Sequence, residues 1–211
     1  LYSSTQCPYL VRRMVSRQLD CPESSIRVIA PDVGGGFGPK AGYYPEEALI
    51  AIASKELKRP VKWSEDRREH FTATNQQRDQ IWELDVAFKK NGEITAIKGH
   101  VIHDSGAFLN YGLLLSATTL MPLPGPYKIK NLHVTLDAIY TNTVSTSPVR
   151  GAGRPNAAYA MDRVIDAVAR HLEIDPADMR HINLVKNEDF PYQPGSKPVS
   201  YTHLRAHETD Y

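Results

Sequence analysis

Cysteine, net charge and long hydrophobic runs are all scarce in this chain of 211 residues. Its two cysteines, Cys7 and Cys21, form no metal-ligand pattern and are too few for a disulfide scaffold, so we expect free thiols in a reducing compartment. A net charge of +1 gives no reason to expect a nucleic acid or an anionic membrane as partner. No apolar run approaches the length of a membrane span. These absences favour a soluble globular protein of the cytoplasm, with the periplasm left open.

The two ends of the chain do not read as parts of the fold. The sequence does not begin with Met, and residues 1–5 read as the middle of something longer. Residues 199–211 resemble the translation of a sequencing adapter, so we exclude them as a non-native tail; a genuine polar tail is the alternative. This also removes His203 and His207, which are spaced like a metal-binding pair. We expect a partial domain over residues 1–193 and an exposed exit segment over residues 194–198.

Hydrophobic periodicity predicts four helices. Residues 8–19 carry apolar side chains on one helical face. A second helix begins at Pro45 and is apolar nearly all round, so we expect it to be buried on most sides. Residues 155–172 repeat apolar side chains at helical spacing, and Asp175 caps a shorter helix that runs through Leu184.

Strand signals lie between these helices. A short buried strand is predicted at Ser25–Ala30, and a sheet region begins at Val61–Trp63. Residues 82–88 alternate apolar and polar side chains, and an Asn-Gly turn leads into a strand at residues 94–101. Residues 132–140 alternate again. Because helices and hairpins mix without a regular βαβ rhythm, the sequence predicts an α+β fold with mixed or antiparallel sheets and packed helices.

A glycine loop, defined here as Gly34–Lys40, follows the first predicted strand. Its bare backbone can adopt positive φ and approach a bound group closely, and successive N–H groups suit an anionic oxygen. The spacing fits neither a phosphate-binding P-loop nor a dinucleotide fingerprint. A sharp turn without a ligand is the alternative that the loop alone leaves open.

A second glycine-rich turn, Arg150–Pro155, precedes the long helix. Its two arginines offer donor forks suited to phosphate or oxo groups beside a helix N-terminus, where free N–H groups favour an anion. Surface ion pairs with carboxylates are the alternative for both arginines. Elsewhere, His103 and Asp104 could form an acid–base pair, but neighbours on a strand face opposite sides, which favours a structural role.

Four segments together carry a resemblance to a known family. They are Ser4–Gln6, Asp32–Lys40, Arg59–Arg67 and Arg150–Pro155, and each alone would be a weak signal. In this order they resemble the large, molybdenum-binding subunit of the xanthine dehydrogenase and aldehyde oxidase family, in its carbon monoxide dehydrogenase-like branch. The resemblance covers essentially all of residues 1–193, which it identifies as part of a molybdopterin-binding domain.

The resemblance implies a set of residues around a molybdenum–molybdopterin cofactor. Gln6 matches a glutamine whose amide hydrogen-bonds a metal-bound oxygen; without the resemblance, a solvated Gln6 and a core-packed Phe37 would be the ordinary interpretations. The pterin's own sulfurs hold the metal, so no protein ligand to the metal is implied. The family's catalytic glutamate lies beyond this segment, so no catalytic residue is assigned. The implied cofactor-binding residues are Gln6, Gly35, Gly36, Phe37, Gly38, Arg150, Gly151, Ala152 and Gly153.

The resemblance also implies a reaction and partners. A molybdenum hydroxylase would oxidise its substrate with oxygen from water and pass electrons to iron–sulfur and FAD partner subunits in a hetero-oligomer. The cytosine dinucleotide form of the cofactor is implied. Ala41, Ala152 and, approximately, His133 stand where purine-oxidising members carry a glutamate, a phenylalanine and an arginine. Gly151 stands where carbon monoxide oxidisers carry a copper-binding cysteine. These departures favour an aldehyde or an N-heterocyclic substrate.

Two other functions remain open at this stage. The fold could persist as a non-redox binding or assembly module without cofactor, and the glycine loop could belong to a nucleotide-binding domain. The presence of Gln6, Gly34–Gly38 and Arg150 in one chain favours the enzyme.

Overall fold

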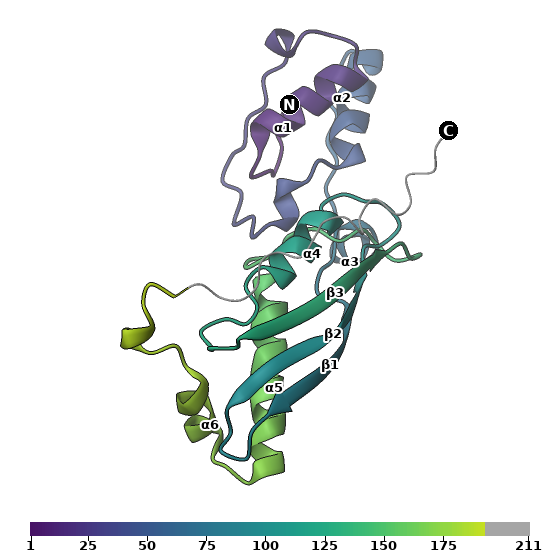
Figure 1. The fold of residues 1–211 in the computed structure, drawn as a ribbon. Coiled ribbons are helices and arrows are strands. Elements are labelled where there is room, and N and C mark those ends of the chain that lie inside the picture. Colours follow the sequence, from purple (N-terminus) through teal and green to yellow (C-terminus); the bar gives the residue numbers. More distant parts are fainter. Residues whose placement is uncertain (193–211) are drawn as a thin grey trace, which may run out of the picture. The chain divides into compact units, whose positions relative to one another are not determined.

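In a computed structural model, residues 1–192 are described, and the chain divides into two compact units (Figure 1). The first unit contains Leu1–Gln77 and Ser147–Arg150, and the second contains Arg78–Thr146 and the chain from Gly151 onward. The predicted exit at 194–198 and the adapter-like tail at 199–211 lie outside the described residues. Within residues 1–192, no helix has both the length and the hydropathy needed to cross a bilayer.

The second unit is built on a three-stranded mixed sheet in the order β1-β2-β3. Strands β1 (Gln80–Phe88) and β2 (Ile94–Asp104) pair antiparallel across the predicted Asn-Gly turn, whose Gly92 has a φ of 88°. Strand β3 (Asn131–Ile139) pairs parallel with β2. Parallel neighbours need a long connection, and here it contains helix α4 (Gly112–Leu120). The predicted α+β class with a mixed sheet is confirmed.

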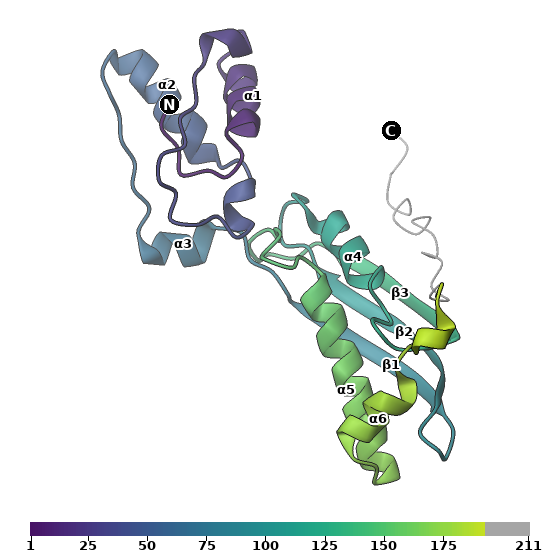
Figure 2. The same cartoon turned by 90° about the vertical axis from the view of Figure 1, so that its left-hand side faces the viewer.

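Helix α5 (Arg154–Leu172) covers one face of this sheet (Figures 1 and 2). Its apolar residues repeat at helical spacing and are buried against the alternate side chains of β1, which stand on the same face of the strand. The predicted stripe on this helix is therefore confirmed. The fully or nearly buried centre of this core comprises Ile94, Ile97, Leu123, Ile129, Ala157, Met161, Ile165, Ala169 and Met179.

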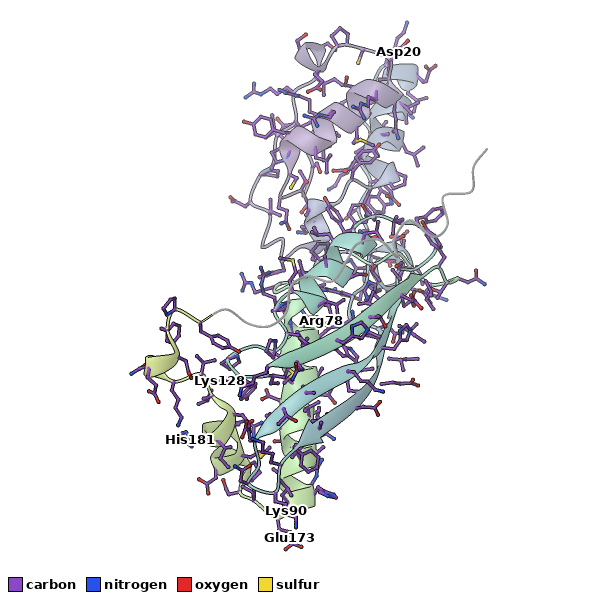
Figure 3. All side chains as sticks on the ribbon, in the orientation of Figure 1. Asp20, Arg78, Lys90, Lys128, Glu173 and His181 are labelled. Atoms are coloured by element: carbon purple, nitrogen blue, oxygen red, sulfur yellow. The ribbon has the colours of Figure 1, made fainter. Side chains whose placement is uncertain are left out.

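Helix α6 (Pro176–Asn183) closes the end of the second unit at which the hairpin turn lies. The Asp175 side chain accepts hydrogen bonds from two N–H groups of its first turn, as predicted for a cap. Figure 3 shows Lys90 of the hairpin and Glu173, which follows α5, at this same end. A short 3-10 turn at Asn187–Asp189 follows.

The first unit consists of helices α1 (Pro8–Gln18), α2 (Pro45–Leu57) and α3 (Arg67–Ala73), together with short 3-10 turns at Glu23–Ser25 and Pro39–Ala41. The predicted helices at 8–19 and from Pro45 are confirmed. Helix α1 buries Val11 and Val15, and helix α3 begins at a capping box formed by Asp66 and Glu69.

Two strand predictions in the first unit are wrong. In the predicted strand Ser25–Ala30, Ser25 ends a 3-10 turn and the rest forms only a single parallel bridge, between Tyr2 and Ile29; the side chains are exposed or half-buried. Val61–Trp63 lies in no helix or strand and pairs with no strand among the described residues. Propensity alone does not make a strand, since a ladder needs a partner on at least one side and Pro60 has no N–H to donate to one.

The burial predicted for α2 is also wrong. Only Ala48 of this helix is buried, whereas Leu49 is 60% exposed and Leu57 is 54% exposed. An apolar helix surface is buried only where another element packs on it. Within residues 1–192, helix α1 covers only part of the apolar surface of α2.

Candidate functional site

Gln6 lies in the short segment that leads into α1. Its backbone N–H donates to the carbonyl oxygen of Lys40 at 3.0 Å, and the Thr5 hydroxyl donates to the same oxygen at 3.2 Å. The side-chain Oε1 of Gln6 accepts a 3.0 Å hydrogen bond from the backbone N–H of Gly38. Because a backbone N–H can pair only with the amide oxygen, this contact fixes which way the amide points. The Nε2 group has no acceptor within residues 1–192 and is available as a donor.

Two glycines of the glycine loop are required by close approach. A Cβ on Gly36 would lie 2.3 Å from Oε1 of Gln6. A Cβ on Gly38, which has a φ of +108°, would lie 1.8 Å from the carbonyl oxygen of Pro148. No other residue fits either distance without displacing backbone or the Gln6 amide. The loop therefore packs between the segment before α1 and the segment Ser147–Arg150, all within the first unit.

Phe37 and Arg150 stack on each other. The guanidinium carbon of Arg150 lies 4.9 Å from the centroid of the Phe37 ring, a cation–π distance. Phe37 has a positive φ of 53° and is 54% exposed, so it is not the core residue that ordinary packing would predict. A non-glycine residue in this conformation is strained, and such strain persists where the surroundings hold it. The arrangement presents an aromatic ring and a positive charge on one surface of the loop.

The backbone of the glycine loop also exposes donors. The N–H groups of Gly34, Gly35, Gly36 and Phe37 donate to no other group in the described part of the chain. Successive free N–H groups beside a guanidinium favour an anionic or oxo-rich ligand. Four of the predicted positions, Gly35–Gly38, thus lie together with Gln6 and Arg150 in one unit.

The remaining predicted positions, Gly151, Ala152 and Gly153, belong to the second unit. Gly153 is the N-cap of α5; its N–H donates to Oγ1 of Thr118 at 3.1 Å. The first N–H groups of α5 are already paired within the turn, and free donors are left at Gly151 and Ala152 among the described residues. These two N–H groups are the donors that an anion could meet at this helix start, and the anion site itself stays a prediction. Arg154 takes part in none of the salt bridges among the described residues, so the structure gives the surface-pair alternative no support for this arginine.

A half-buried tyrosine, Tyr44, supports the glycine loop through hydrogen bonds. The Tyr44 hydroxyl donates to the carbonyl oxygen of Pro39 at 2.7 Å and accepts from the Asn75 amide at 3.2 Å. Burial raises the pKa of Tyr44 to about 12, so the phenol stays neutral and acts as a hydrogen-bonding prop. Burial also raises the pKa of the neighbouring Glu47, whose carboxylate accepts from the Tyr44 N–H at 3.1 Å.

His103 and Asp104 in the second unit have structural roles, as predicted. Nδ1 of the buried His103 lies 2.8 Å from Nε2 of Gln80. The Asp104 carboxylate accepts from the N–H of Gly106 at 2.7 Å and from the Thr141 hydroxyl at 2.6 Å, which tie down the following turn. Over residues 1–192, no group of three or more His, Cys, Asp or Glu side chains could hold a metal ion.

Lys40 is the residue of this site to which the sequence analysis assigned no role. Its ammonium donates to Oγ of Ser4 and to the carbonyl oxygen of Val33, so it spans the glycine loop. The only sign of this role in the sequence was the position of Lys40 at the end of a glycine motif. Periodicity and propensity do not predict which groups such a lysine contacts.

The chain matches the family model described as the molybdopterin cofactor-binding domain over residues 1–184, which include parts of both units. It is 38% identical over 196 residues to the carbon monoxide dehydrogenase large chain of Afipia carboxidovorans, covering 91% of this chain and 24% of that protein. It is 35% identical over 196 residues to the nicotine 6-hydroxylase large subunit of Paenarthrobacter nicotinovorans, again covering 91% and 24%.

Among solved structures, quinoline 2-oxidoreductase from Pseudomonas putida 86 is similar to the chain with a TM-score of 0.85 and 37% identity. The similarity covers 92% of this chain and 25% of that one. The chain therefore spans about a quarter of the length of these relatives.

Proposed function

The chain belongs to the molybdopterin cofactor-binding domain family, and from this premise we propose that it forms part of the cofactor site of a molybdenum hydroxylase. The observation that carries the proposal is the convergence of Gln6, Phe37, Gly38 and Arg150 in the first unit. These residues come from three separate stretches of sequence. Because Gln6, Phe37 and Arg150 are exposed, packing of the hydrophobic core does not explain why they lie together.

The residues present fit an oxygen-rich, anionic group. Gln6 offers an oriented amide donor, the loop from Gly34 to Phe37 offers backbone N–H groups, and Arg150 offers positive charge. The glycines at positions 36 and 38 leave no room for a Cβ, so the backbone itself forms the contact surface. When bound, a molybdenum cofactor supplies the redox centre for inserting a water-derived oxygen into the substrate.

In this proposal the chain positions and stabilises the cofactor rather than providing an acid or base. Gln6 holds an oxygen of the cofactor through Nε2, and Arg150 balances negative charge beside it. Gly151, Ala152 and Gly153 contribute from the second turn. The general base is a glutamate outside this chain, and electrons leave through iron–sulfur and FAD partner subunits of a cytoplasmic hetero-oligomer. The cytosine dinucleotide form of the cofactor is part of the same proposal.

The substrate class we propose is an aldehyde or an N-heterocycle. Relatives named for quinoline and nicotine chemistry support an N-heterocycle, and Ala41, His133 and Ala152 depart from the purine pattern described above. Gly151 argues against carbon monoxide: its φ is +97°, and a Cβ there would come within 2.7 Å of the Pro155 ring. The chain therefore lacks the copper-binding cysteine, and a cysteine placed here would also have a strained backbone.

The test is to express the complete subunit that contains this chain, with its partner subunits, in a host that makes the molybdenum cofactor. We expect molybdenum by elemental analysis, and hydroxylation of quinoline, nicotinate or an aromatic aldehyde with incorporation of ¹⁸O from labelled water. A folded protein without molybdenum, made in a host that loads a known relative, would instead favour a cofactor-free binding or assembly module.

A further inference from the structure

Lys40 connects the segment before α1, which contains Gln6, to the glycine loop through both its backbone and its side chain. Its carbonyl oxygen accepts from the N–H of Gln6 at 3.0 Å and from the Thr5 hydroxyl at 3.2 Å. Its ammonium donates to Oγ of Ser4 at 2.9 Å and to the carbonyl oxygen of Val33 at 2.7 Å. The residue therefore binds the segment before α1 through both its backbone and its side chain.

The bond to Val33 closes the glycine loop. Val33 immediately precedes the loop and Lys40 ends it, so the ammonium joins the two ends over a separation of seven residues. Glycine-rich backbone loses more conformational freedom on ordering than any other, so a loop with four glycines needs fixed ends to hold one shape. A charge-assisted hydrogen bond from a half-buried ammonium supplies such an end.

The bond to Ser4 places Gln6 relative to that closed loop. Ser4 lies two residues before Gln6, and the Gln6 amide in turn accepts from Gly38 inside the loop. A lysine ammonium has three donors and no acceptor, so it can serve Ser4 and Val33 together. Methionine would fill the same space without a donor, and arginine is longer and planar, so neither replaces it.

We propose that Lys40 is a positioning residue for the candidate cofactor site: it fixes the position of the Gln6 amide relative to the glycine loop. This inference rests on the proposed function, because the position of the Gln6 amide affects catalysis only if Gln6 contacts the cofactor. Lys40 acts through Gln6, and it does not itself bind the substrate or the cofactor.

The experiment is a double-mutant cycle in the complete enzyme. We expect Lys40→Met to lower kcat about tenfold, with KM and molybdenum content within about twofold of wild type, because binding is kept while the donor is misplaced. In a Gln6→Ala background the same substitution should change kcat less than about twofold, since its effect passes through Gln6. Lys55→Met, on an exposed part of α2, is the matched control and should leave kcat unchanged.

A second measurement needs no cofactor. Hydrogen exchange in the cofactor-free protein should be faster at the Gly38 amide in Lys40→Met than in wild type, and unchanged in Lys55→Met. Equal losses of kcat in the wild-type and Gln6→Ala backgrounds, or an unchanged Gly38 amide, would overturn the role of Lys40. A wild-type enzyme without molybdenum would end the proposed function, while the exchange measurement would still decide whether Lys40 holds Gln6 and the loop together.

Discussion

The amide oxygen of Gln6 accepts a hydrogen bond from the backbone N–H of Gly38, which lies 32 residues further along the chain. This contact does two things at once. It closes the segment before α1 onto the glycine loop, and it leaves the Gln6 NH₂ group as the free end of an oriented amide. Orientation costs a side chain its rotamer freedom, so an amide fixed before a ligand arrives binds that ligand more strongly.

Gln6→Glu separates the two ends of this amide. A carboxylate still accepts from Gly38 but has no NH₂ to donate, so we expect kcat to fall by about a hundredfold, as for the loss of one preorganised donor. Molybdenum content and thermal stability should stay near wild type. Initial rates, elemental analysis and thermal unfolding measure the three quantities. Gln18→Glu is the matched control, because Gln18 is an exposed glutamine on α1 whose amide oxygen accepts from the Tyr43 hydroxyl and a carboxylate keeps that acceptor; a Gln6→Glu enzyme at full rate would contradict the donor role.

Gly38→Ala and Gly34→Ala are a matched pair in one loop. Both glycines have positive φ, but a Cβ on Gly38 would meet the Pro148 carbonyl oxygen at 1.8 Å, whereas nothing lies within 4 Å of one on Gly34. We expect Gly34→Ala to destabilise the chain by about 1 kcal/mol, from the backbone conformation alone. Gly38→Ala should cost more than about 3 kcal/mol. Urea unfolding measures both, and equal losses would mean that the close approach does not exist.

Arg150→Ala should release the cofactor. The substitution removes the positive charge stacked on Phe37, so we expect molybdenum content to fall below about a third of wild type after gel filtration. Phe37→Leu, which removes the ring and keeps the arginine, should lose less. Arg17→Ala, an exposed arginine in the last turn of α1, is the charge-matched control. Unchanged metal occupancy in Arg150→Ala would show that this arginine does not help to retain the cofactor.

Local patterns predicted the second unit well, whereas in the first unit they predicted helices α1 and α2 but placed two strands wrongly. The stripe on α5, the alternation in β1 and the Asn-Gly turn each report contacts made within the same unit, so period and composition suffice. Ile26–Ala30 and Val61–Trp63 have strand composition but find no ladder, because pairing depends on what else lies alongside.

For the candidate site, the sequence predicted which residue types take part but not which of them contact one another. Glycines at positions 36 and 38 indicate close approach, but nothing local says that Gln6 and Pro148 are the groups that approach them. The role of Lys40 was missed for the same reason: its partners, Ser4 and Val33, are identified only when distant segments are folded together. Sequence motifs locate such a site, and tertiary contacts explain it.

The buried His103 should make stability fall at acidic pH. Trp82 donates to Oε1 of Gln80, so Nε2 of Gln80 must donate to Nδ1 of His103, which accepts only when the imidazole is neutral. Burial accordingly lowers the pKa of His103, against the opposite effect of the neighbouring Asp104 and Asp79 carboxylates.

Stability should therefore be full above the unfolded-state pKa of about 6.5 and decline below it, by up to about 1.4 kcal/mol per pH unit, until the lowered folded-state pKa is reached. The reason is that only the unfolded chain gains a proton in this window. Urea unfolding at several pH values measures the slope, which His103→Gln should reduce. The exposed His181 on α6 provides the control, His181→Gln (Figure 3). An unchanged slope in His103→Gln would contradict the assignment.

Asn183 should be among the most sensitive residues of the second unit. It is 2% exposed; its Oδ1 accepts from the Ile94 N–H at 2.9 Å, and its Nδ2 donates to the carbonyl oxygens of Gly92 and Met179, each at 2.9 Å. One side chain thus joins the hairpin to α6. Asn183→Ala leaves buried backbone groups without partners, so we expect a loss of roughly 2–3 kcal/mol in urea unfolding. The exposed Asn142→Ala should change stability by less than about 0.5 kcal/mol; similar losses in the two variants would mean that Asn183 does not bridge these elements.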